Sequence, residues 1–270
     1  MIQSMILFGI LNVTADSFSD GGEFLDPTKA NEKGMELIAN GAHVIDISAQ
    51  SSNINAIQIE PELEWARIEN LVQGFHAAGY KISVDTYKPY VIRKSIEANV
   101  SYINNINSFR DEESLSILAD FKDSLPELVL MYSHNNGDMA EAKSDLTPNT
   151  IMDSIYRFFD KKISDLQRLG VPETKLIFDP GMGLFLGSDP LLSIEVLRNI
   201  SEFKKRFGRV MVSVSRKSFI GNLLGGIPPK DRGAGTLSVE LYLYQQNIDM
   251  IRTHDVKQLS QAMRLMEALK

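Results

Sequence analysis

Short apolar runs alternate along the chain with longer segments whose apolar positions follow helical spacing. The runs are rich in Val, Ile, Leu and Met, which is typical of strands buried on both faces of a parallel sheet. We predict eight strands, at 5–11, 43–48, 81–85, 101–104, 128–132, 175–179, 209–214 and 248–252. Eight strand–helix units in one chain of this size favour a closed barrel over an open sheet. The predicted fold is therefore α/β, a (β/α)₈ TIM barrel forming a single domain over residues 1–270.

Helical spacing is clearest in two of the intervening segments. The segment 61–78 begins with a proline suited to the first turn, and one face carries Leu63, Ala66, Leu71, Phe75 and Ala78. In the segment 148–169, Thr147 is the predicted cap and Pro148 takes the first helical position. The region 217–247 is predicted to hold two helical pieces broken by glycines and prolines.

Composition narrows the class of protein. The chain has 270 residues, is 43% hydrophobic and 23% charged, and carries a net charge of −7, values ordinary for a soluble globular protein. The acidic balance argues against a nucleic-acid partner, which would require a basic patch, but still permits a small anionic substrate.

Location follows from a few absences in the sequence. There is no cysteine, no apolar run near the roughly 20 residues of a membrane span, and no basic residue before Lys29. We therefore expect a cytoplasmic protein with no membrane partner and no secretory signal.

Polar residues end the predicted strands. In chain order they are Asn12, Asp46, Asp85, Asn104, Met131 to Ser133, Asp179, Ser215 to Lys217, and Arg252 with His254. In a barrel all eight carboxyl ends meet at one mouth, so these residues would converge. Each could singly be a helix cap or a turn residue. Together, carboxylates, amides and cations at the same ends of the strands favour a functional site.

Two kinds of ligand chemistry are represented at this mouth. One set of residues offers carboxylate acceptors, an amide and an ammonium group, which suit a flat heteroaromatic ring with amino and carbonyl edges. This set is Asp85, Asn104, Asp179 and Lys217. Other residues suit an anionic oxygen cluster such as a diphosphate with Mg²⁺, namely Asn12, Arg252 and His254. The chain contains no HExxH, GxGxxG or GxxxxGK[ST] motif, so a zinc protease, a Rossmann site and a P-loop are unsupported.

Six motifs, in this order and spread over nearly the whole chain, resemble those of dihydropteroate synthase. They are FGILNVTADSFSDGG, SVDT, YINN, FDPGMG, SVSRKSFIG and IRTHDV. The resemblance implies a TIM barrel that uses Mg²⁺ as its cofactor and assembles as a homodimer. It further implies that 6-hydroxymethyl-7,8-dihydropterin diphosphate is joined to p-aminobenzoate, giving dihydropteroate for folate synthesis. Sulfonamides, which mimic p-aminobenzoate, inhibit the family.

The resemblance also implies residue roles. The pterin positions are Asp85, Asn104, Asp179, Lys217, Met131 and Asp46. The diphosphate positions are Asn12, Arg252 and His254, with Asn12 also the metal position. The p-aminobenzoate positions are Phe18, Ser52, Ser215, Arg216 and Lys217. The residues expected to act in catalysis are Phe18, Asp20, Asp85, Lys217, Arg252 and His254. Segments 13–24 and 48–58 are expected to close over the site.

Departures from the family pattern lie mainly on the p-aminobenzoate side. The usual Thr-Arg pair after the second strand is Ser52-Asn53, the Asp after Asn104 is Asn105, and Tyr132 stands within an altered fifth-strand segment. The Ser-Ser-Asn reading at 51–53, the Met-Gly-Leu-Phe-Leu-Gly run at 182–187 and the RTHDV ending look most like the sulfonamide-insensitive Sul-type branch, so sulfonamide resistance is expected.

The expected reaction is dissociative loss of diphosphate followed by attack of the arylamine. Three alternatives stay open at this point. They are an inactive pterin-binding paralogue, a methyltetrahydrofolate methyltransferase and an interaction scaffold.

Overall fold

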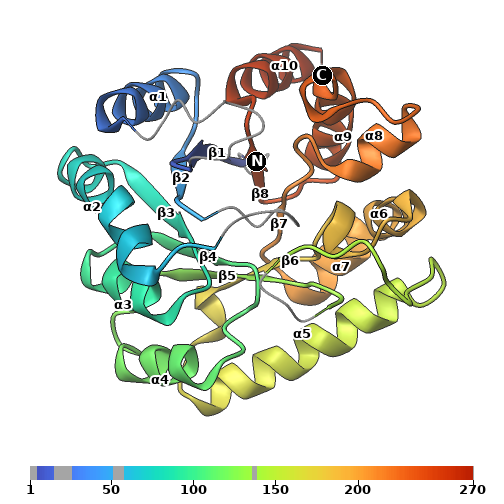
Figure 1. Cartoon of the computed structure of the whole chain (residues 1–270). Coiled ribbons are helices and arrows are strands. Elements are labelled where there is room, and N and C mark those ends of the chain that lie inside the picture. Colours follow the sequence, from blue (N-terminus) through green and yellow to red (C-terminus); the bar gives the residue numbers. More distant parts are fainter. Residues whose placement is uncertain (1–4, 15–25, 51–57, 136–138, 270) are drawn as a thin grey trace.

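The structure is a computed structural model that describes residues 5–14, 26–50, 58–135 and 139–269. Parallel strands lie at the centre of the molecule and helices surround them (Figure 1). The strands are β1 (Ile6–Asn12), β2 (Val44–Ser48), β3 (Lys81–Asp85), β4 (Tyr102–Asn105), β5 (Glu127–Met131), β6 (Leu176–Asp179), β7 (Met211–Val212) and β8 (Met250–Thr253).

Helices follow the strands in sequence. They are α1 (Pro27–Ala39), α2 (Pro61–Ala77), α3 (Pro89–Glu97), α4 (Glu112–Asp120), α5 (Ile151–Arg168), α6 (Pro190–Arg198), α7 (Ile200–Phe207), α8 (Ser218–Leu223), α9 (Gly233–Gln245) and α10 (Val256–Ala268). No helix among the described residues is both long and apolar enough to cross a membrane.

The sheet closes on itself. Its strand order is β6-β5-β4-β3-β2-β1-β8-β7, and every ladder is parallel. A parallel bridge between Phe178 and Val210 joins the two outer strands, where the Phe178 N–H donates to the Arg209 carbonyl at 2.9 Å. The predicted single-domain TIM barrel is therefore confirmed.

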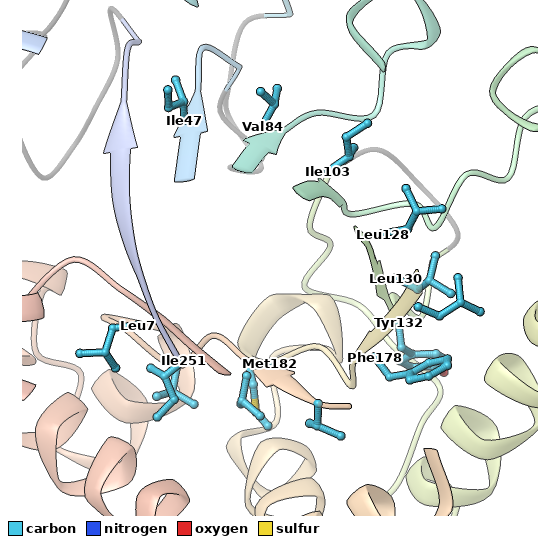
Figure 2. Packing of buried hydrophobic residues seen from close by; sticks show 14 of the residues in the cluster. Leu7, Ile47, Val84, Ile103, Leu128, Leu130, Tyr132, Phe178, Met182 and Ile251 are labelled. Atoms are coloured by element: carbon cyan, nitrogen blue, oxygen red, sulfur yellow. The ribbon is translucent and has the colours of Figure 1, made fainter. Parts of the chain in front are cut away.

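Alternate residues of each strand face opposite sides of the barrel wall. The outward set packs against the helices in one large apolar cluster, and Figure 2 shows Ile47, Val84 and Phe178 within it. The inward set closes the barrel interior with a second cluster, made of Phe8, Val44, Tyr102, Val129, Ile177, Met211 and Met250. Both faces of the strands are thus buried, which explains the apolar runs in the sequence.

Inward positions change from apolar to polar towards the carboxyl ends of the strands. On four strands, a polar residue lies two positions beyond the residue that belongs to the interior apolar cluster. These polar residues are Asp46 on β2, Asn104 on β4, Asp179 on β6 and Arg252 on β8. The two-residue period keeps each polar side chain on the interior face of its strand. The barrel therefore has an apolar floor and a polar mouth.

Two strand predictions need correction. Asp46 does not end β2, because the ladder with β1 continues to the Asn12–Ser48 pair. The predicted strand 209–214 is paired only at Met211–Val212 and at the Phe178–Val210 bridge. The chain leaves the sheet there because the Val214 carbonyl accepts the Lys217 N–H at 3.1 Å, which closes a turn.

Helix predictions were wrong in two details. Leu63 is 47% exposed, whereas Glu64 is buried in its place because Lys88 supplies a buried cationic partner. The fifth helix begins at Ile151 instead of Pro148, because Thr147 and Thr150 form a hydrogen-bonded turn that precedes it. The break of 217–247 into two helical pieces is observed as α8 and α9.

Candidate active site

Arg252 forms the centre of the charge network at the mouth. Its Nε donates to Asp46 Oδ2 at 2.5 Å, and its Nη2 donates to Asp85 Oδ2 at 2.6 Å. Asp46 is fully buried, so its charge depends on this guanidinium for compensation. Burial alone would lower the pKa of Arg252, but the two carboxylates raise it above its ordinary value.

Three groups at the mouth have pKa values moved towards neutrality. Burial raises the pKa of Asp85 to about 7 against the opposing effect of Arg252. Burial also raises the pKa of Asp179 to about 6, although its Oδ1 accepts the Gly181 N–H at 2.8 Å. Burial lowers the pKa of Lys217 to about 8, and Arg252 adds to this shift. Such perturbed groups gathered in one place are typical of a functional site.

Neighbouring strands supply an amide beside one of these carboxylates and an apolar surface beside the other. Asn104 lies opposite Asp85 in the β3–β4 ladder, and Met131 lies opposite Asp179 in the β5–β6 ladder. Met131 belongs to a small apolar cluster with Tyr87, Ile106 and Phe185. The mouth therefore combines hydrogen-bonding edges with an apolar wall, as a flat heteroaromatic ligand requires.

Phe185 also contacts the cation on the far side of the mouth. Lys217 Nζ lies 4.6 Å from the centroid of the Phe185 ring, within cation–π range. Phe185 lies in a short 3₁₀ turn after β6, at Gly183–Phe185. Phe185 has no predicted role, although an aromatic residue between glycines beyond a strand end is a usable signal in the sequence.

A second polar group follows β7 and β8. Ser215 Oγ lies 3.0 Å from His254 Nδ1, and burial lowers the pKa of His254 to about 3 with help from Arg216 and Arg252. His254 is therefore a neutral imidazole at pH 7. The side chain of Arg216 turns to Asp255, with Nη2 at 3.3 Å from Oδ1.

Asn12 ends β1 and is half-buried at the mouth. Its amide makes no hydrogen bond to another residue in the described ranges. Those ranges also contain no cluster of three or more His, Cys, Asp or Glu side chains able to hold a metal ion. A single amide oxygen fits Mg²⁺, which keeps several waters and takes further ligands from substrate phosphates.

The described site residues thus come from several strands and meet at one end of the barrel. Direct contacts link Asp46, Asp85 and Arg252, and link Ser215 with His254. Phe18, Asp20 and Ser52, and with them most of the segments 13–24 and 48–58, lie outside the described residues.

Two departures from the family pattern have structural explanations. Asn105 Oδ1 accepts the backbone N–H groups of Asn107 and Phe109, at 3.1 and 3.0 Å, and so shapes the loop after β4. Tyr132 faces the helices, where its ring packs edge-on against Phe158 with centroids 5.3 Å apart. Neither side chain is directed at the polar groups described above.

Comparison with known proteins identifies relatives over the full chain. The sequence profile of the family described as pterin binding enzyme matches residues 8–254. Dihydropteroate synthase type-3 of Escherichia coli is 42% identical over 97% of this chain and 98% of its own length. Dihydropteroate synthase type-2 of Escherichia coli is 40% identical over 100% of this chain and 98% of its own length. A crystal structure of the Yersinia pestis dihydropteroate synthase in complex with a sulfonamide drug superposes with a TM-score of 0.88, at 30% identity, over 100% of this chain and 95% of that one.

Proposed function

The chain belongs to the pterin binding enzyme family as a dihydropteroate synthase, and from this membership we propose how its residues divide the work of the reaction. The enzyme joins 6-hydroxymethyl-7,8-dihydropterin diphosphate to p-aminobenzoate and releases diphosphate, a step of folate biosynthesis. The observation that carries the assignment of residues is the gathering of Asp85, Arg252 and Lys217 at the mouth of one barrel.

The pterin is proposed to bind along the polar row on β3, β4 and β6. Carboxylates accept hydrogen bonds from ring N–H and amino groups, which suits Asp85 and Asp179. Asn104 and Lys217 complete the row with an amide and a cation for the ring carbonyl. The apolar cluster around Met131 and Phe185 would pack against the face of the ring.

The diphosphate is proposed to leave towards Arg252 and His254. An arylamine is a neutral nucleophile at pH 7, so the barrier lies in breaking the C–O bond and not in proton removal. A cation and a hydrogen-bond donor near the departing oxygens lower that barrier by stabilising the charge that develops on them. Arg252 would have to release Asp85 when substrate arrives, because both then have ligands of their own.

We infer that Mg²⁺ is the cofactor and that Asn12 would hold it together with substrate oxygens and water. When bound, Mg²⁺ supplies positive charge at the leaving diphosphate. The test is the dependence of the rate on Mg²⁺ in wild type and in Asn12→Ala. We expect the variant to need a higher Mg²⁺ concentration for half-maximal rate, and an unchanged requirement would remove Asn12 from the metal site.

One assay separates the enzyme from the other readings of the fold. Purified protein is mixed with the pterin diphosphate and Mg²⁺, and diphosphate release is measured with and without p-aminobenzoate. We expect release that depends on the arylamine, together with formation of dihydropteroate. Pterin binding without release would identify an inactive paralogue, and absence of pterin binding would leave only a scaffold.

We also propose that the enzyme tolerates sulfonamides. The proposal is supported by the similarity to the type-2 and type-3 synthases and by the departures at Ser52 and Asn53 on the predicted p-aminobenzoate side. Discrimination requires a clash where the drug extends beyond p-aminobenzoate, because one lost methyl contact is worth only about 1–3 kcal/mol. The measurement is KM for p-aminobenzoate against Ki for sulfamethoxazole. We expect Ki to exceed KM, and comparable values would contradict tolerance.

A homodimer and a cytoplasmic location complete the proposal. The dimer is supported by the family resemblance and by exposed apolar side chains on the last helices, among them Leu223, Tyr242 and Leu265. Sedimentation should give twice the chain mass for wild type and a smaller species for Leu265→Lys. A monomeric wild type would contradict the dimer. The cytoplasmic location stays a prediction from the sequence.

A further inference from the structure

The turn that follows β7 contains a residue in an unfavourable backbone conformation. Arg216 has a φ of +59°, in the left-handed region that residues with a Cβ atom rarely adopt. The turn spans residues 214–217 and is closed by the Lys217 N–H, which donates to the Val214 carbonyl at 3.1 Å. A positive φ at the third residue of such a turn normally calls for glycine or asparagine. An arginine keeps this conformation only where its surroundings hold it there.

The first turn of α9 binds both backbone polar groups of Arg216. The Arg216 N–H donates to Thr236 Oγ1 at 3.0 Å, and the Arg216 carbonyl accepts from Arg232 Nη1 at 2.8 Å. Arg232 is the N-cap residue of α9 and Thr236 follows four positions later, so the two side chains are neighbours on one side of the helix. Together they form a clamp on the backbone of Arg216.

Arg232 is itself fixed between α8 and α9. Its Nε donates to the Ile227 carbonyl at 3.0 Å. Its guanidinium lies so close to Gly221 on α8 that a Cβ atom there would be 2.4 Å from Nε. A Cβ atom on Gly235 of α9 would in turn lie 2.6 Å from Ile220 Cγ2. Glycine at these two positions therefore lets the helices approach closely enough for Arg232 to reach the turn after β7.

The conformation of Arg216 decides where its two sequence neighbours point. On one side, Ser215 Oγ lies 3.0 Å from His254 Nδ1. On the other side, Lys217 Nζ lies 4.6 Å from the centroid of the Phe185 ring. Because each peptide unit is planar, a change of Arg216 to a negative φ would rotate the adjoining peptide planes and turn Lys217 out of the mouth.

We propose that Arg232 and Thr236 are positioning residues of the active site, which hold Arg216 in the left-handed conformation and thereby direct Lys217 into the mouth. They act on the reaction only through the turn at 214–217. The contribution to catalysis rests on the proposed function, which assigns Lys217 to the pterin, whereas the effect on the turn does not.

The ionisation of Lys217 reports on the direction of its side chain. Burial lowers the pKa of Lys217 to about 8 and Arg252 on β8 adds to this shift, while Asp179 on β6 and Asp85 on β3 oppose it. A turn that relaxes would return the ammonium group to solvent. The pKa of Lys217 should then rise towards the ordinary value of a lysine, because burial is the largest cause of its shift.

The test is the titration of Lys217 in full-length protein. Lysine labelled with ¹³C is followed by NMR from pH 6 to 11, and the signal of Lys217 is assigned with Lys217→Arg. In wild type we expect a transition near pH 8. In Arg232→Met, and in the nearly isosteric Thr236→Val, the transition should move to higher pH. A Lys217 transition at the wild-type pH in both variants would overturn the clamp.

Arg198→Met is the matched control for Arg232→Met. Arg198 lies at the end of α6 in an exposed ion pair with Glu195, so its loss should leave the Lys217 transition where it is in wild type. A shift in this control as large as that in Arg232→Met would also count against the clamp, since any lost arginine would then suffice.

Arg216→Gly distinguishes positioning from general support of the fold. Glycine adopts a positive φ without the steric penalty of a Cβ atom, so the turn in this variant no longer depends on the clamp. Added to Arg216→Gly, the changes Arg232→Met and Thr236→Val should each move the Lys217 transition much less than they do in wild type. Equal shifts in the two backgrounds would show that Arg232 and Thr236 only support the packing of α8 and α9, and would overturn the proposal.

Kinetics separate the clamp from the proposed function. At pH 7, kcat/KM for the pterin diphosphate should fall about tenfold in Arg232→Met, the value of one hydrogen bond to a charged group. A Lys217 transition that moves while kcat/KM stays at the wild-type value would support the clamp and contradict the assignment of Lys217 to the pterin.

Discussion

Arg252 Nη2 lies 2.6 Å from Asp85 Oδ2, so two groups predicted for opposite halves of the substrate are bound to each other. Asp85 was assigned to the pterin and Arg252 to the diphosphate. The Nε of the same guanidinium also donates a hydrogen bond to Asp46 Oδ2. Arg252 thus compensates two carboxylates, and under the proposed assignment we expect substrate binding to exchange one of these partners for the diphosphate.

Asp85→Asn should weaken pterin binding and turnover together. The change keeps the shape of the side chain but removes the charge that accepts from Arg252 and that we propose accepts from the pterin. Loss of a charged hydrogen bond at a buried site is worth about 1.5–3 kcal/mol, so we expect kcat/KM for the pterin diphosphate to fall about 10- to 100-fold. Steady-state kinetics at saturating p-aminobenzoate measure the effect. Asp160→Asn, at an exposed ion pair with Arg206, is the matched control and should have wild-type kinetics.

Arg252→Met should destabilise the fold as well as abolish turnover. Removing the guanidinium leaves the fully buried Asp46 without its cation and takes from Asp85 its ion-pair partner, and breaking a buried pair costs about 3–5 kcal/mol. Urea unfolding at pH 7.5 gives the free energy of unfolding. The double variant Arg252→Met with Asp46→Asn should recover part of the stability and none of the activity. Equal stability of the single and double variants would show that Arg252 does not compensate Asp46.

Much of the fold was predictable because its signals are local. Strands buried on both faces leave apolar runs, and a barrel gathers their ends, so the polar residues after the runs were correctly expected at one mouth. Directions of side chains within the mouth were not predictable. The bonds from Arg252 to Asp46 and Asp85 depend on the registers of β1, β2, β3 and β8 acting together.

The errors have a common physical origin in long-range partners. Glu64 is buried on α2 because it is paired with Lys88, which immediately precedes α3. The helical pattern of the sequence alone favours Leu63 for the buried face. Strand β7 was predicted too long because the turn that ends it is closed by backbone groups, Val214 and Lys217.

The rate should depend on pH through three groups whose pKa values lie near neutrality. The pKa values of Asp85, about 7, and Asp179, about 6, are raised by burial, so lowering the pH protonates both and removes the charges that would bind the pterin. The pKa of Lys217 is lowered by burial to about 8, so its cation is lost as the pH rises. We expect kcat/KM for the pterin diphosphate to be bell-shaped, with an acid limb near pH 6–7 and an alkaline limb near pH 8.

The variant Lys217→Arg tests whether loss of the Lys217 charge causes the alkaline limb of the pH profile. Arginine stays charged throughout this range, so the variant should keep the acid limb and lose the decline that comes from Lys217. An unchanged alkaline limb in Lys217→Arg would contradict the assignment of that limb to Lys217.

Lys88→Met should affect p-aminobenzoate more than the pterin. The Lys88 ammonium is paired with Glu64 at 2.9 Å and also donates to the Gln50 side chain at 3.2 Å and to the Ile59 carbonyl. Gln50 and Ile59 flank the segment that contains Ser52, which was predicted for p-aminobenzoate. Loss of the Lys88 ammonium should therefore raise KM for p-aminobenzoate about tenfold. The same change leaves Glu64 buried and unpaired, which should destabilise the fold by about 3–5 kcal/mol.

The double variant Lys88→Met with Glu64→Leu separates these two effects. Removing the orphaned acid together with the lysine replaces a buried ion pair by apolar side chains, so most of the stability should return. The hydrogen bonds from Lys88 to Gln50 and Ile59 remain absent in this double variant. KM for p-aminobenzoate should therefore stay high, while KM for the pterin diphosphate stays near wild type. If KM for p-aminobenzoate recovered along with stability, Lys88 would act on the site only through the fold, because restored packing alone would then suffice to place the two ends of the segment.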